Sequence, residues 1–259
     1  MQENVITSLT NSRVKRLVAL QQKSSLRIDE GVFVVEGVRE IERCHQSGLV
    51  IDEVYYCPAI LPERPAVPCG AAFEVTQAVY DKIAYRGSTE GAMAVVKTRN
   101  IALADLDLPE RPLVVVLESV EKPGNLGAVL RSADAAGVDA VIVCDPLTDL
   151  WNPNLVRSST GAIFSVPCVA CTSEECIAFL KERGIAILTA QLQDSELYYD
   201  TDMRRATAIV MGTEATGLTD VWRQAADAHI RIPMLGVVDS LNVSVSAAIL
   251  MYEAVKQRQ

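Results

Sequence analysis

The sequence predicts an α/β protein with two domains: a small N-terminal α/β domain and a C-terminal α/β domain built on a parallel sheet. In the second half of the chain, apolar runs such as residues 113–117 alternate with segments of helical periodicity. Such runs are typical of strands buried on both faces of a parallel sheet. A similar alternation fills the first hundred residues, and residues 97–112 lose it and end in Pro109-Glu110-Arg111-Pro112. We take those residues as the linker and place the domains at residues 1–104 and 105–259.

The N-terminal domain is expected to alternate helices with short strands. Asn11 or Ser12 is a suitable N-cap for a first helix, in which Val14, Leu17 and Val18 share one face. The later elements follow from apolar runs and from glycine and proline breaks. They are a strand at 33–35, a helix through Ile41, a strand at 51–57, a proline-rich loop at 58–68, a helix through Val79 and Ile83, and a strand at 92–96.

The C-terminal domain is expected to continue the strand and helix alternation that is typical of βαβ units. A helix at 126–136 follows the first strand and stops at Gly137, a residue that often ends helices. The later elements are strands at 140–144, near 164–166, at 185–190, at 206–211 and at 229–232, with a short helix before the second of these strands and a longer helix at 173–183.

The last helix is expected to begin at Leu241, with Asp239 or Ser240 as its N-cap. Its apolar residues form two nearly opposite faces: Leu241, Val245, Ala248, Ile249 and Tyr252 on one, and Val243, Ala247, Leu250, Met251 and Ala254 on the other. A helix that is apolar on most sides is buried on most sides. We therefore expect it to thread the core or to meet a second subunit.

Composition favours a soluble globular protein. With 259 residues and 49% apolar residues, the chain can bury a sizeable core. The first twenty residues lack an apolar signal segment, and no run reaches membrane-spanning length, so we expect a cytoplasmic protein that contacts no membrane. Seven cysteines are scattered, and the pair Cys168 and Cys171 has no second pair or histidine cluster to complete a zinc site. We expect buried free thiols and no metal.

The net charge of −9 argues against a nucleic-acid binder on bulk electrostatics, but the charge is uneven. The acidic excess falls within residues 101–259, whereas residues 1–100 are balanced. Near the N-terminus, basic residues outnumber acidic ones. If RNA binds, its phosphates are expected to meet this segment first, through Arg13, Lys15, Arg16, Lys23 and Arg27. The alternative is an ordinary solvated helix face.

Three loops are expected to follow the carboxyl ends of strands in the C-terminal domain: 118–125, 212–217 and 233–240. In open α/β sheets, ligands bind at those ends. Polar residues in and after the third loop have no evident structural purpose, which makes them candidates to face a ligand. We therefore expect the functional site of this domain to be built from these three loops.

Three motifs at these loops carry a resemblance to a known family. They are Asn125-x-Gly-Ala-x-x-Arg131, then Met211-Gly212-x-Glu214-x-x-Gly217, then Ile232-Pro233-Met234-x-Gly236 with Ser240-Leu241-Asn242-Val243-Ser244-Val245. In this order they resemble the motifs of the SpoU/TrmH branch of the SPOUT superfamily, which are RNA ribose 2′-O-methyltransferases. The N-terminal domain more weakly resembles that family's substrate-binding domain, through Arg27, Phe33, Glu36-Gly37 and Ser88-Thr89-Glu90-Gly91.

The resemblance implies a fold, a cofactor and partners. Periodicity alone predicts an ordinary open parallel sheet, since knotted chains are nearly absent from proteins. The family is an exception, with a C-terminal trefoil knot that holds S-adenosyl-L-methionine. The knot would explain glycine at positions 212 and 236, where backbones would pass closely. The resemblance also implies a homodimer that acts on tRNA or rRNA.

The site residues implied by the resemblance fall into two groups. Gly212, Ile232 and Leu241 would hold the adenosyl part of the cofactor. The catalytic neighbourhood would contain Asn125, Arg131, Glu214, Ser240 and Asn242. Family accounts make Arg131 the base, but a guanidinium is effectively never deprotonated. We therefore expect Arg131 to clamp a phosphate and to stabilise the developing alkoxide.

The two histidines are not expected to act as the base, although histidine is the usual one. His45 is expected at the surface, and His229 is expected to be a satisfied residue within the sheet.

Two other classes of function compete with the methyltransferase. One is a non-catalytic RNA-binding protein of the same fold, which the intact motifs disfavour. The other is a nucleotide-dependent oxidoreductase, because Asp145 lies about twenty residues after the first loop, like the ribose-binding acid of dinucleotide sites. Gly124 and Gly127 lack the G-x-G-x-x-G spacing, so the oxidoreductase is disfavoured too.

Overall fold

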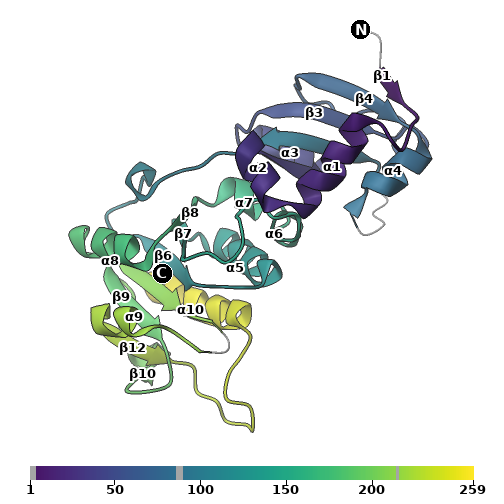
Figure 1. The fold of residues 1–259 in the computed structure, drawn as a ribbon. Helices are drawn as coiled ribbons and strands as arrows, with labels where there is room; N and C mark the ends of the chain where they lie inside the picture. The colour runs from purple at the N-terminus through teal and green to yellow at the C-terminus, as the bar shows by residue number, and fades with distance from the viewer. Residues whose placement is uncertain (1–3, 86–89, 214–215) are drawn as a thin grey trace. The chain divides into compact units, whose positions relative to one another are not determined.

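The computed structural model describes residues 4–85, 90–213 and 216–259 (Figure 1). The chain forms two compact units. Unit 1 contains Met1–Arg99 and Asp149–Phe164, and unit 2 contains Asn100–Thr148 and Ser165–Gln259. A single boundary between residues 104 and 105 does not anticipate the second segment of unit 1. We call that segment, residues 149–164, the insert.

Unit 1 contains a five-stranded mixed sheet in the order β1-β4-β3-β5-β2. β5 runs antiparallel to β2 and β3, whereas β4 runs parallel to β1 and β3. The strands are β1 (Asn4–Ile6), β2 (Val32–Glu36), β3 (Ile51–Tyr56), β4 (Ala71–Val75) and β5 (Ala92–Lys97). The expected strands at 33–35, 51–57 and 92–96 are confirmed. The sequence patterns missed β1 and β4, which are short and have few large apolar residues.

The helices of unit 1 cover this sheet and complete its core. They are α1 (Ser12–Gln22), α2 (Ser24–Glu30), α3 (Val38–Gln46), α4 (Gln77–Ile83), α6 (Pro153–Ser158) and α7 (Ala162–Ser165). Asn11 is the N-cap of α1 and accepts a hydrogen bond from the backbone N–H of Arg13, as expected. Val14 and Leu17 of α1 are fully buried against the strands.

Unit 2 contains a seven-stranded sheet in the order β10-β12-β9-β11-β6-β7-β8, and all of its described strand pairs are parallel. The strands are β6 (Leu113–Glu118), β7 (Ala140–Cys144), β8 (Cys168–Cys171), β9 (Ala186–Ala190), β10 (Glu196–Leu197), β11 (Thr207–Met211) and β12 (Ala228–Arg231). Every residue of the central strands β6, β7 and β11 is buried. The prediction of a parallel sheet with doubly buried strands is therefore confirmed.

The helices of unit 2 follow its strands. They are α5 (Pro123–Ala136), α8 (Ser173–Glu182), α9 (Asp220–Ala225) and α10 (Val243–Arg258), with short 3-10 turns at Leu103–Asp105 and Tyr198–Asp200. The expected strand near residues 164–166 is wrong, because Phe164 belongs to α7 and the strand begins at Cys168. Phe164 is apolar because it is buried beside Phe33 of β2, with 6.0 Å between ring centroids.

The last helix differs from its prediction in two ways. It begins at Val243, and its N-cap is Asn242, not Asp239 or Ser240, because the exposed loop continues past both of those residues. In addition, only one of its two apolar faces is buried in this chain: Val243, Ala247, Leu250, Met251 and Ala254. On the other face, Val245 is 47% and Tyr252 is 51% exposed.

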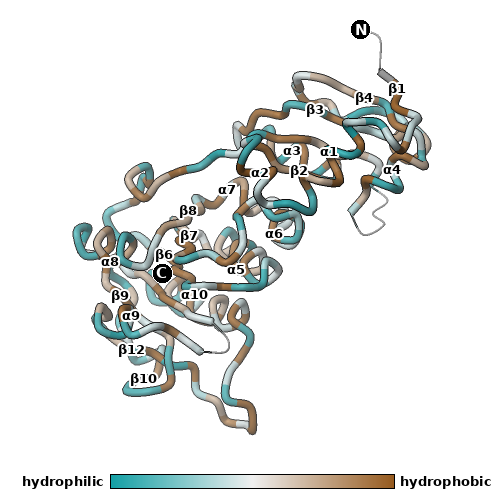
Figure 2. The backbone as a smooth tube through the Cα atoms, in the orientation of Figure 1, coloured by the Kyte–Doolittle hydropathy of each residue, from teal (hydrophilic) through white to brown (hydrophobic). Residues whose placement is uncertain are grey.

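The loop between β12 and α10 carries hydrophobic residues at its tip (Figure 2). Leu235 is 96% and Val237 is 99% exposed. Among the described residues, no helix has the length and apolar content needed to cross a membrane.

Candidate active site

The loops that follow β6 and β11 are joined through the carboxylate of Glu118. Glu118 ends β6 and is only 3% exposed. Its Oε2 accepts a hydrogen bond from the backbone N–H of Thr219 (2.9 Å), and its Oε1 accepts one from the Thr219 hydroxyl (2.6 Å). Hydrogen bonds to an ionised acceptor are stronger than neutral ones. The carboxyl ends of β6 and β11 therefore present their loops as one connected surface.

Gly212 directly follows β11 and lies where the chain passes close to itself. A Cβ atom on this residue would collide with the backbone of Gly217 and Leu218. The N–H of Gly217 donates to the carbonyl of Thr213 (3.1 Å), and the hydroxyls of Thr213 and Thr216 are 2.8 Å apart. Only glycine fits this close passage.

The expectation for Gly236 is wrong. No atom lies within 4 Å of the Cβ position on this residue, because the tip of its loop is exposed. Its φ angle also lies outside the left-handed region. Of the two glycines that were expected at a close approach of backbones, Gly212 lies at one and Gly236 does not.

The third loop meets the first through two asparagines. The Nδ2 of Asn242 donates a hydrogen bond to the Oδ1 of Asn125 (3.2 Å), which lies in the first turn of α5. The Oδ1 of Asn242 accepts from the backbone N–H (3.0 Å) and the hydroxyl (2.6 Å) of Ser244, so the same side chain caps α10. The structure therefore brings together Asn125 and Asn242, which are 117 positions apart.

Two hollows open in unit 2, the first between these loops and the second between the third loop and the segment after β9. The first has a volume of about 100 Å³ and is lined by Val120, Glu121, Lys122, Asn125, Gly212, Thr213 and Val243. The second has a volume of about 140 Å³, and its apolar wall includes Leu192, Ile232, Met234, Leu241 and Leu250. Ser240 and Asp239 add polar groups to the second hollow. Concave, mostly apolar sites with a few polar groups are typical of small-ligand binding.

Gln191 is a site residue that the sequence patterns did not indicate. It lines the second hollow just after β9, and its Nε2 donates to the carbonyl of Gln193 (2.9 Å). Its Oε1 is buried and has no hydrogen-bond partner among the described residues. A buried acceptor without a partner is costly, so a ligand N–H or O–H would stabilise it. A single glutamine after a strand gives no signal that sequence reasoning could use.

The other residues expected in the catalytic neighbourhood are less connected. Arg131 lies on the exposed face of α5, about 9 Å along the helix axis from Asn125, given the usual rise per residue. Its side chain makes no hydrogen bond or ion pair with another described residue. Glu214 lies outside the described residues.

Neither histidine is available as a base near these loops. The Nδ1 of His229 is 2.6 Å from the hydroxyl of Thr189 on the neighbouring strand, as expected for a satisfied sheet residue. His45 is exposed on α3 in unit 1, which is also as expected.

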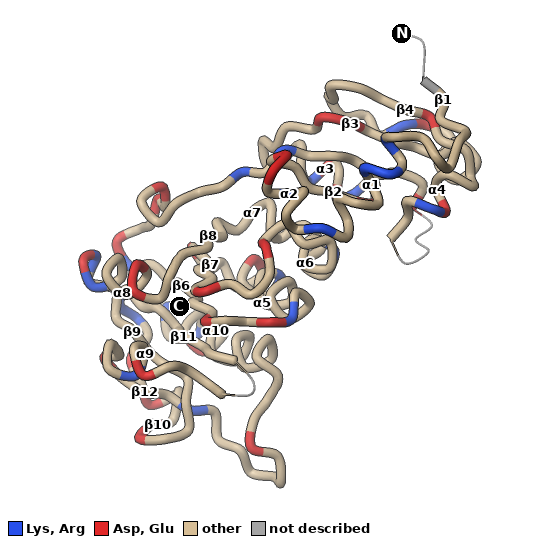
Figure 3. Tube along the Cα trace, in the orientation of Figure 1, with Lys and Arg blue, Asp and Glu red and all other residues tan. Residues whose placement is uncertain are grey.

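Figure 3 shows where basic and acidic residues lie along the chain, with basic positions on α1. Two of the expected RNA-binding residues of unit 1 are arginines that already have acidic partners. Arg13 pairs with Glu53 at 2.5 Å, and its guanidinium lies over the Phe73 ring, 4.3 Å from the centroid. Arg16 pairs with Glu30 at 2.7 Å and with Glu53 at 2.9 Å. Although burial alone would lower the pKa of Arg16, the hydrogen bond that Arg16 donates to Glu30 and the charge of Glu53 raise it.

The other three basic residues differ sharply in exposure. Arg27 is only 3% exposed, and its Nε and Nη2 donate to Asp149 at 3.1 and 2.6 Å. Its Nη1 donates to the carbonyl of Leu20 at 2.5 Å. Lys15 and Lys23 are exposed and make no side-chain hydrogen bond or ion pair with another described residue. The guanidinium of Arg27 is therefore used within the protein, whereas the ammonium groups of Lys15 and Lys23 can bind an anion.

Comparison with protein-family models identifies both parts of the chain. Residues 112–252, more than half of the chain, match the model of the SpoU rRNA Methylase family. The chain belongs to this family. Residues 11–94 match the MRM3-like substrate binding domain. The SpoU match covers all three loops described above, and the second match covers most of unit 1.

Individual relatives agree with the family. The chain is 41% identical over 175 residues to the 23S rRNA (guanosine-2'-O-)-methyltransferase RlmB of Bordetella pertussis, covering 66% of this chain and 71% of the relative. It is 31% identical to a 23S rRNA uridine 2'-O-methyltransferase of Streptomyces viridochromogenes, covering 96% of this chain and 91% of the relative. An AdoMet-bound rRNA methyltransferase from Sinorhizobium meliloti matches over 100% of both chains, with a TM-score of 0.90 and 28% identity.

Proposed function

We propose that this SpoU-family chain transfers a methyl group from S-adenosyl-L-methionine to a ribose 2′-hydroxyl of ribosomal RNA in the cytoplasm. The observation that carries the proposal is that three strand-end loops meet in unit 2. Asn125 of the first loop is hydrogen-bonded to Asn242 after the third, and Gly212 lies where the backbone of the second loop passes close to itself. The names of the relatives favour 23S rRNA over tRNA. They differ in the nucleotide modified, so the target base stays open.

The residues around the second hollow fit the cofactor. Ile232 and Leu241 provide apolar walls for the adenosyl part, and the Oε1 of Gln191 offers an unused acceptor for an N–H or O–H of the ligand. Gly212 lines the first hollow, where its missing side chain lets a ligand approach the backbone. When bound, S-adenosyl-L-methionine supplies an electrophilic methyl group on a positively charged sulfur.

The side chains of this chain would act by positioning and by charge. The ribose 2′-hydroxyl is a weak acid, so negative charge develops on its oxygen as its proton passes to water, before the methyl group bonds to that oxygen. Arg131, which is exposed and unpaired among the described residues, would hold the adjacent phosphate and stabilise that charge. Asn125, Ser240 and Asn242 would orient the ribose, and Glu214 would complete the group.

The test is methyl transfer from tritiated S-adenosyl-L-methionine to purified RNA. We expect incorporation into 23S rRNA that lacks its native methylation, at a ribose 2′-oxygen, and little into bulk tRNA. RNA binding without incorporation would favour the non-catalytic alternative. Tight binding of NAD in calorimetry, without binding of S-adenosyl-L-methionine, would favour the oxidoreductase.

We assign RNA binding to residues 1–104 and cofactor binding to residues 105–259. The match of residues 11–94 to a substrate binding domain supports this division. Lys15 and Lys23 are the best candidates for phosphate contacts, because both are exposed and unpaired among the described residues. Replacing both with alanine should weaken RNA binding and flatten its dependence on salt concentration. An unchanged salt dependence would contradict these contacts.

We also propose a homodimer formed through α10. Val245 and Tyr252 lie on its exposed apolar face, and apolar residues at the tip of the preceding loop are exposed as well. A second copy would bury such a patch. Sedimentation should give a dimer for the natural chain and a monomer for a Val245→Glu, Tyr252→Glu variant. Tyr199→Glu is the control, since Tyr199 is similarly exposed (46%) but outside α10.

The C-terminal trefoil knot is a further part of this proposal. β12 is separated from β6 by β9 and β11 in the sheet, yet α10, which follows β12, packs against α5, which follows β6. The connecting loop therefore crosses the ends of two strands. Pulling the chain by its termini would test the knot, because a knotted chain extends less than the full contour of about 3.3–3.6 Å per residue.

A further inference from the structure

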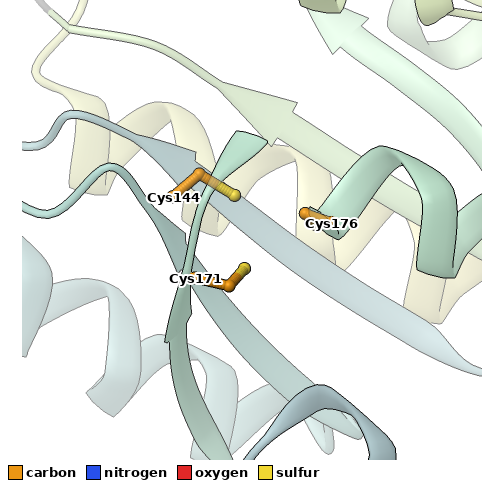
Figure 4. Close-up of side chains that lie close together, drawn as sticks. All are labelled: Cys144, Cys171 and Cys176. Carbon is orange, nitrogen blue, oxygen red and sulfur yellow. The ribbon is translucent and has the colours of Figure 1, made fainter. Parts of the chain in front are cut away.

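Three cysteines from separate elements lie close together in unit 2 (Figure 4). Cys144 ends β7, Cys171 ends β8, and Cys176 lies in the first half of α8. Their sulfur atoms all lie within 4.8 Å of one another. Cys144 and Cys176 are fully buried, whereas Cys171 is partly exposed. We call these three residues the cysteine cluster.

The fold holds the cluster in place through the ends of two neighbouring strands. Cys144 and Cys171 are register partners in the parallel ladder of β7 and β8, so their side chains project from the same face of the sheet. Thr172 and Glu175 form a capping box that fixes the start of α8 directly after Cys171. One turn later, this helix places Cys176 beside the other two thiols.

One oxygen of each nearby carboxylate, on Asp145 and on Glu175, accepts hydrogen bonds from neighbouring residues. The Oδ2 of Asp145 accepts hydrogen bonds from the hydroxyl (2.6 Å) and the backbone N–H (3.3 Å) of Ser173. The Oε2 of Glu175 accepts from the backbone N–H of Thr172 (2.9 Å). The ligand atoms that lie within 4.8 Å of one another at this point are the three sulfur atoms, and neither carboxylate belongs to that group. A purely sulfur ligand set selects soft cations such as Cu⁺ and Zn²⁺ over Mg²⁺ or Ca²⁺.

The spacing of the sulfur atoms suits an ion better than a disulfide. A point equidistant from three atoms at the corners of a 4.8 Å triangle lies about 2.8 Å from each, and a metal–thiolate bond is about 2.3 Å. Each sulfur would need to move by at most about half an ångström, which a small side-chain rotation supplies. A disulfide would need two of them to approach to about 2.05 Å and would leave the third thiol without a partner.

We propose that Cys144, Cys171 and Cys176 form a three-thiolate site for a soft metal cation, with Cu⁺ the best match. A trigonal Cu⁺ ion needs no further ligand, whereas Zn²⁺ would need a fourth one, which water could provide on the exposed side of Cys171. The site is independent of the proposed methyl transfer.

Metal binding is expected to stabilise unit 2, because an ion that binds only the folded chain shifts the folding equilibrium.

The cluster is also close to the first loop of the candidate active site. The carbonyl of Cys144 accepts a hydrogen bond from the backbone N–H of Ser119 (2.9 Å), the first residue after β6.

The test is titration of the fully reduced, full-length chain with Cd²⁺, Zn²⁺ and Cu⁺ in a thiol-free reductant. Cd²⁺ reports thiolate ligands through its ultraviolet charge-transfer absorption. We expect one ion per chain, protection of three thiols from alkylation, and a higher melting temperature, with Cu⁺ displacing Zn²⁺. Cys171→Ser should lose the one-to-one binding and the shift in melting temperature. Cys168→Ser, in the same strand but outside the cluster, should keep both.

Three results would overturn the site. They are no charge-transfer absorption at stoichiometric Cd²⁺, unchanged binding in Cys171→Ser, and a disulfide within the cluster in protein purified without reductant. If Cys171→Ser fails to fold, as judged by circular dichroism, Cys176→Ala is measured instead. Unchanged binding in that variant would count against the site equally.

Discussion

The strand-end loops of unit 2 and the insert of unit 1 are both assembled from residues far apart in the sequence, but by different means. In unit 2, local backbone features define the loops. Gly212 leaves room for the chain to pass, and Asn242 caps α10 while it bonds to Asn125. Each role needs one residue type at one position. The family motifs contain these residues, so the sequence predicts their positions, although it does not predict that Asn242 caps α10.

The insert of unit 1 is held by side chains with no local signature. Trp151 stacks on Phe33 with 4.3 Å between ring centroids, and Asp149 pairs with the buried Arg27. Nothing near Asp149 in the sequence indicates a partner 122 positions away. A site that is shaped by local backbone features can be predicted from sequence, because each feature requires a particular residue at a particular position. A site that depends on pairs of side chains far apart in the sequence can be found only in the structure.

The largest expected effect is at Gly212. Gly212→Val should abolish binding of S-adenosyl-L-methionine, because any Cβ atom there meets the backbone of Gly217 and Leu218. Calorimetry measures the affinity, and circular dichroism confirms that the variant is folded. Gly236→Val is the matched control, since its Cβ would meet nothing within 4 Å. Undiminished cofactor affinity in Gly212→Val would show that the close approach of backbones at Gly212 does not shape the cofactor site.

The second prediction concerns the insert. Asp149→Asn leaves the guanidinium of Arg27 buried without its countercharge, which should cost about 3–5 kcal/mol of unfolding free energy. Urea unfolding followed by the fluorescence of Trp151, in a Trp222→Phe background, measures the change in unit 1. Asp202→Asn is the control, because its ion pair with Arg204 is exposed and should contribute nothing measurable. Equal midpoints for both variants would contradict a structural role for the insert.

These two cases show how far sequence reasoning reaches. The parallel sheet of unit 2 and the positions of Asn125, Gly212 and Asn242 follow from periodicity and motif. The five N-terminal basic residues look equivalent in the sequence, yet Arg27 is buried and Lys15 is exposed. Their difference depends on acidic partners contributed by other elements. The cysteine cluster escaped prediction for the same reason, because β7, β8 and α8 each contribute one thiol.

The insert also limits how the domains can be separated. A fragment that begins at residue 105 would keep the insert but lose β2 and α2, against which Trp151 and Asp149 pack. Such a fragment would expose aromatic surface that the intact chain buries. Loss of RNA binding in that fragment should therefore be compared with a fragment in which a short polar linker replaces residues 149–164.

The third prediction concerns Arg131. Arg131→Ala should retain cofactor affinity and slow methyl transfer by about 10²–10³-fold, if the guanidinium acts mainly on the transition state. Arg131→Lys should recover little, because a point charge lacks the planar fork of arginine. Single-turnover rates of Arg131→Lys from pH 7 to 10 separate this role from that of a base. A rate that rises to near the natural value as the lysine deprotonates would refute the phosphate clamp.

The smallest expected effect is at Asn242, whose side chain both caps α10 and donates a hydrogen bond to Asn125. Two substitutions can separate these roles. Asn242→Ala removes both the cap of α10 and the bond to Asn125, and it should cost about 1 kcal/mol of unfolding free energy. Asn242→Asp keeps an oxygen to accept the N–H of Ser244, but it loses the amide that donates to Asn125. Stability should then stay near the natural value while methyl transfer falls. If Asn242→Asp is as unstable as Asn242→Ala, the bond between the loops matters more than the cap. If Asn242→Asp is fully active, that bond has no part in the reaction, and the asparagine serves the helix alone.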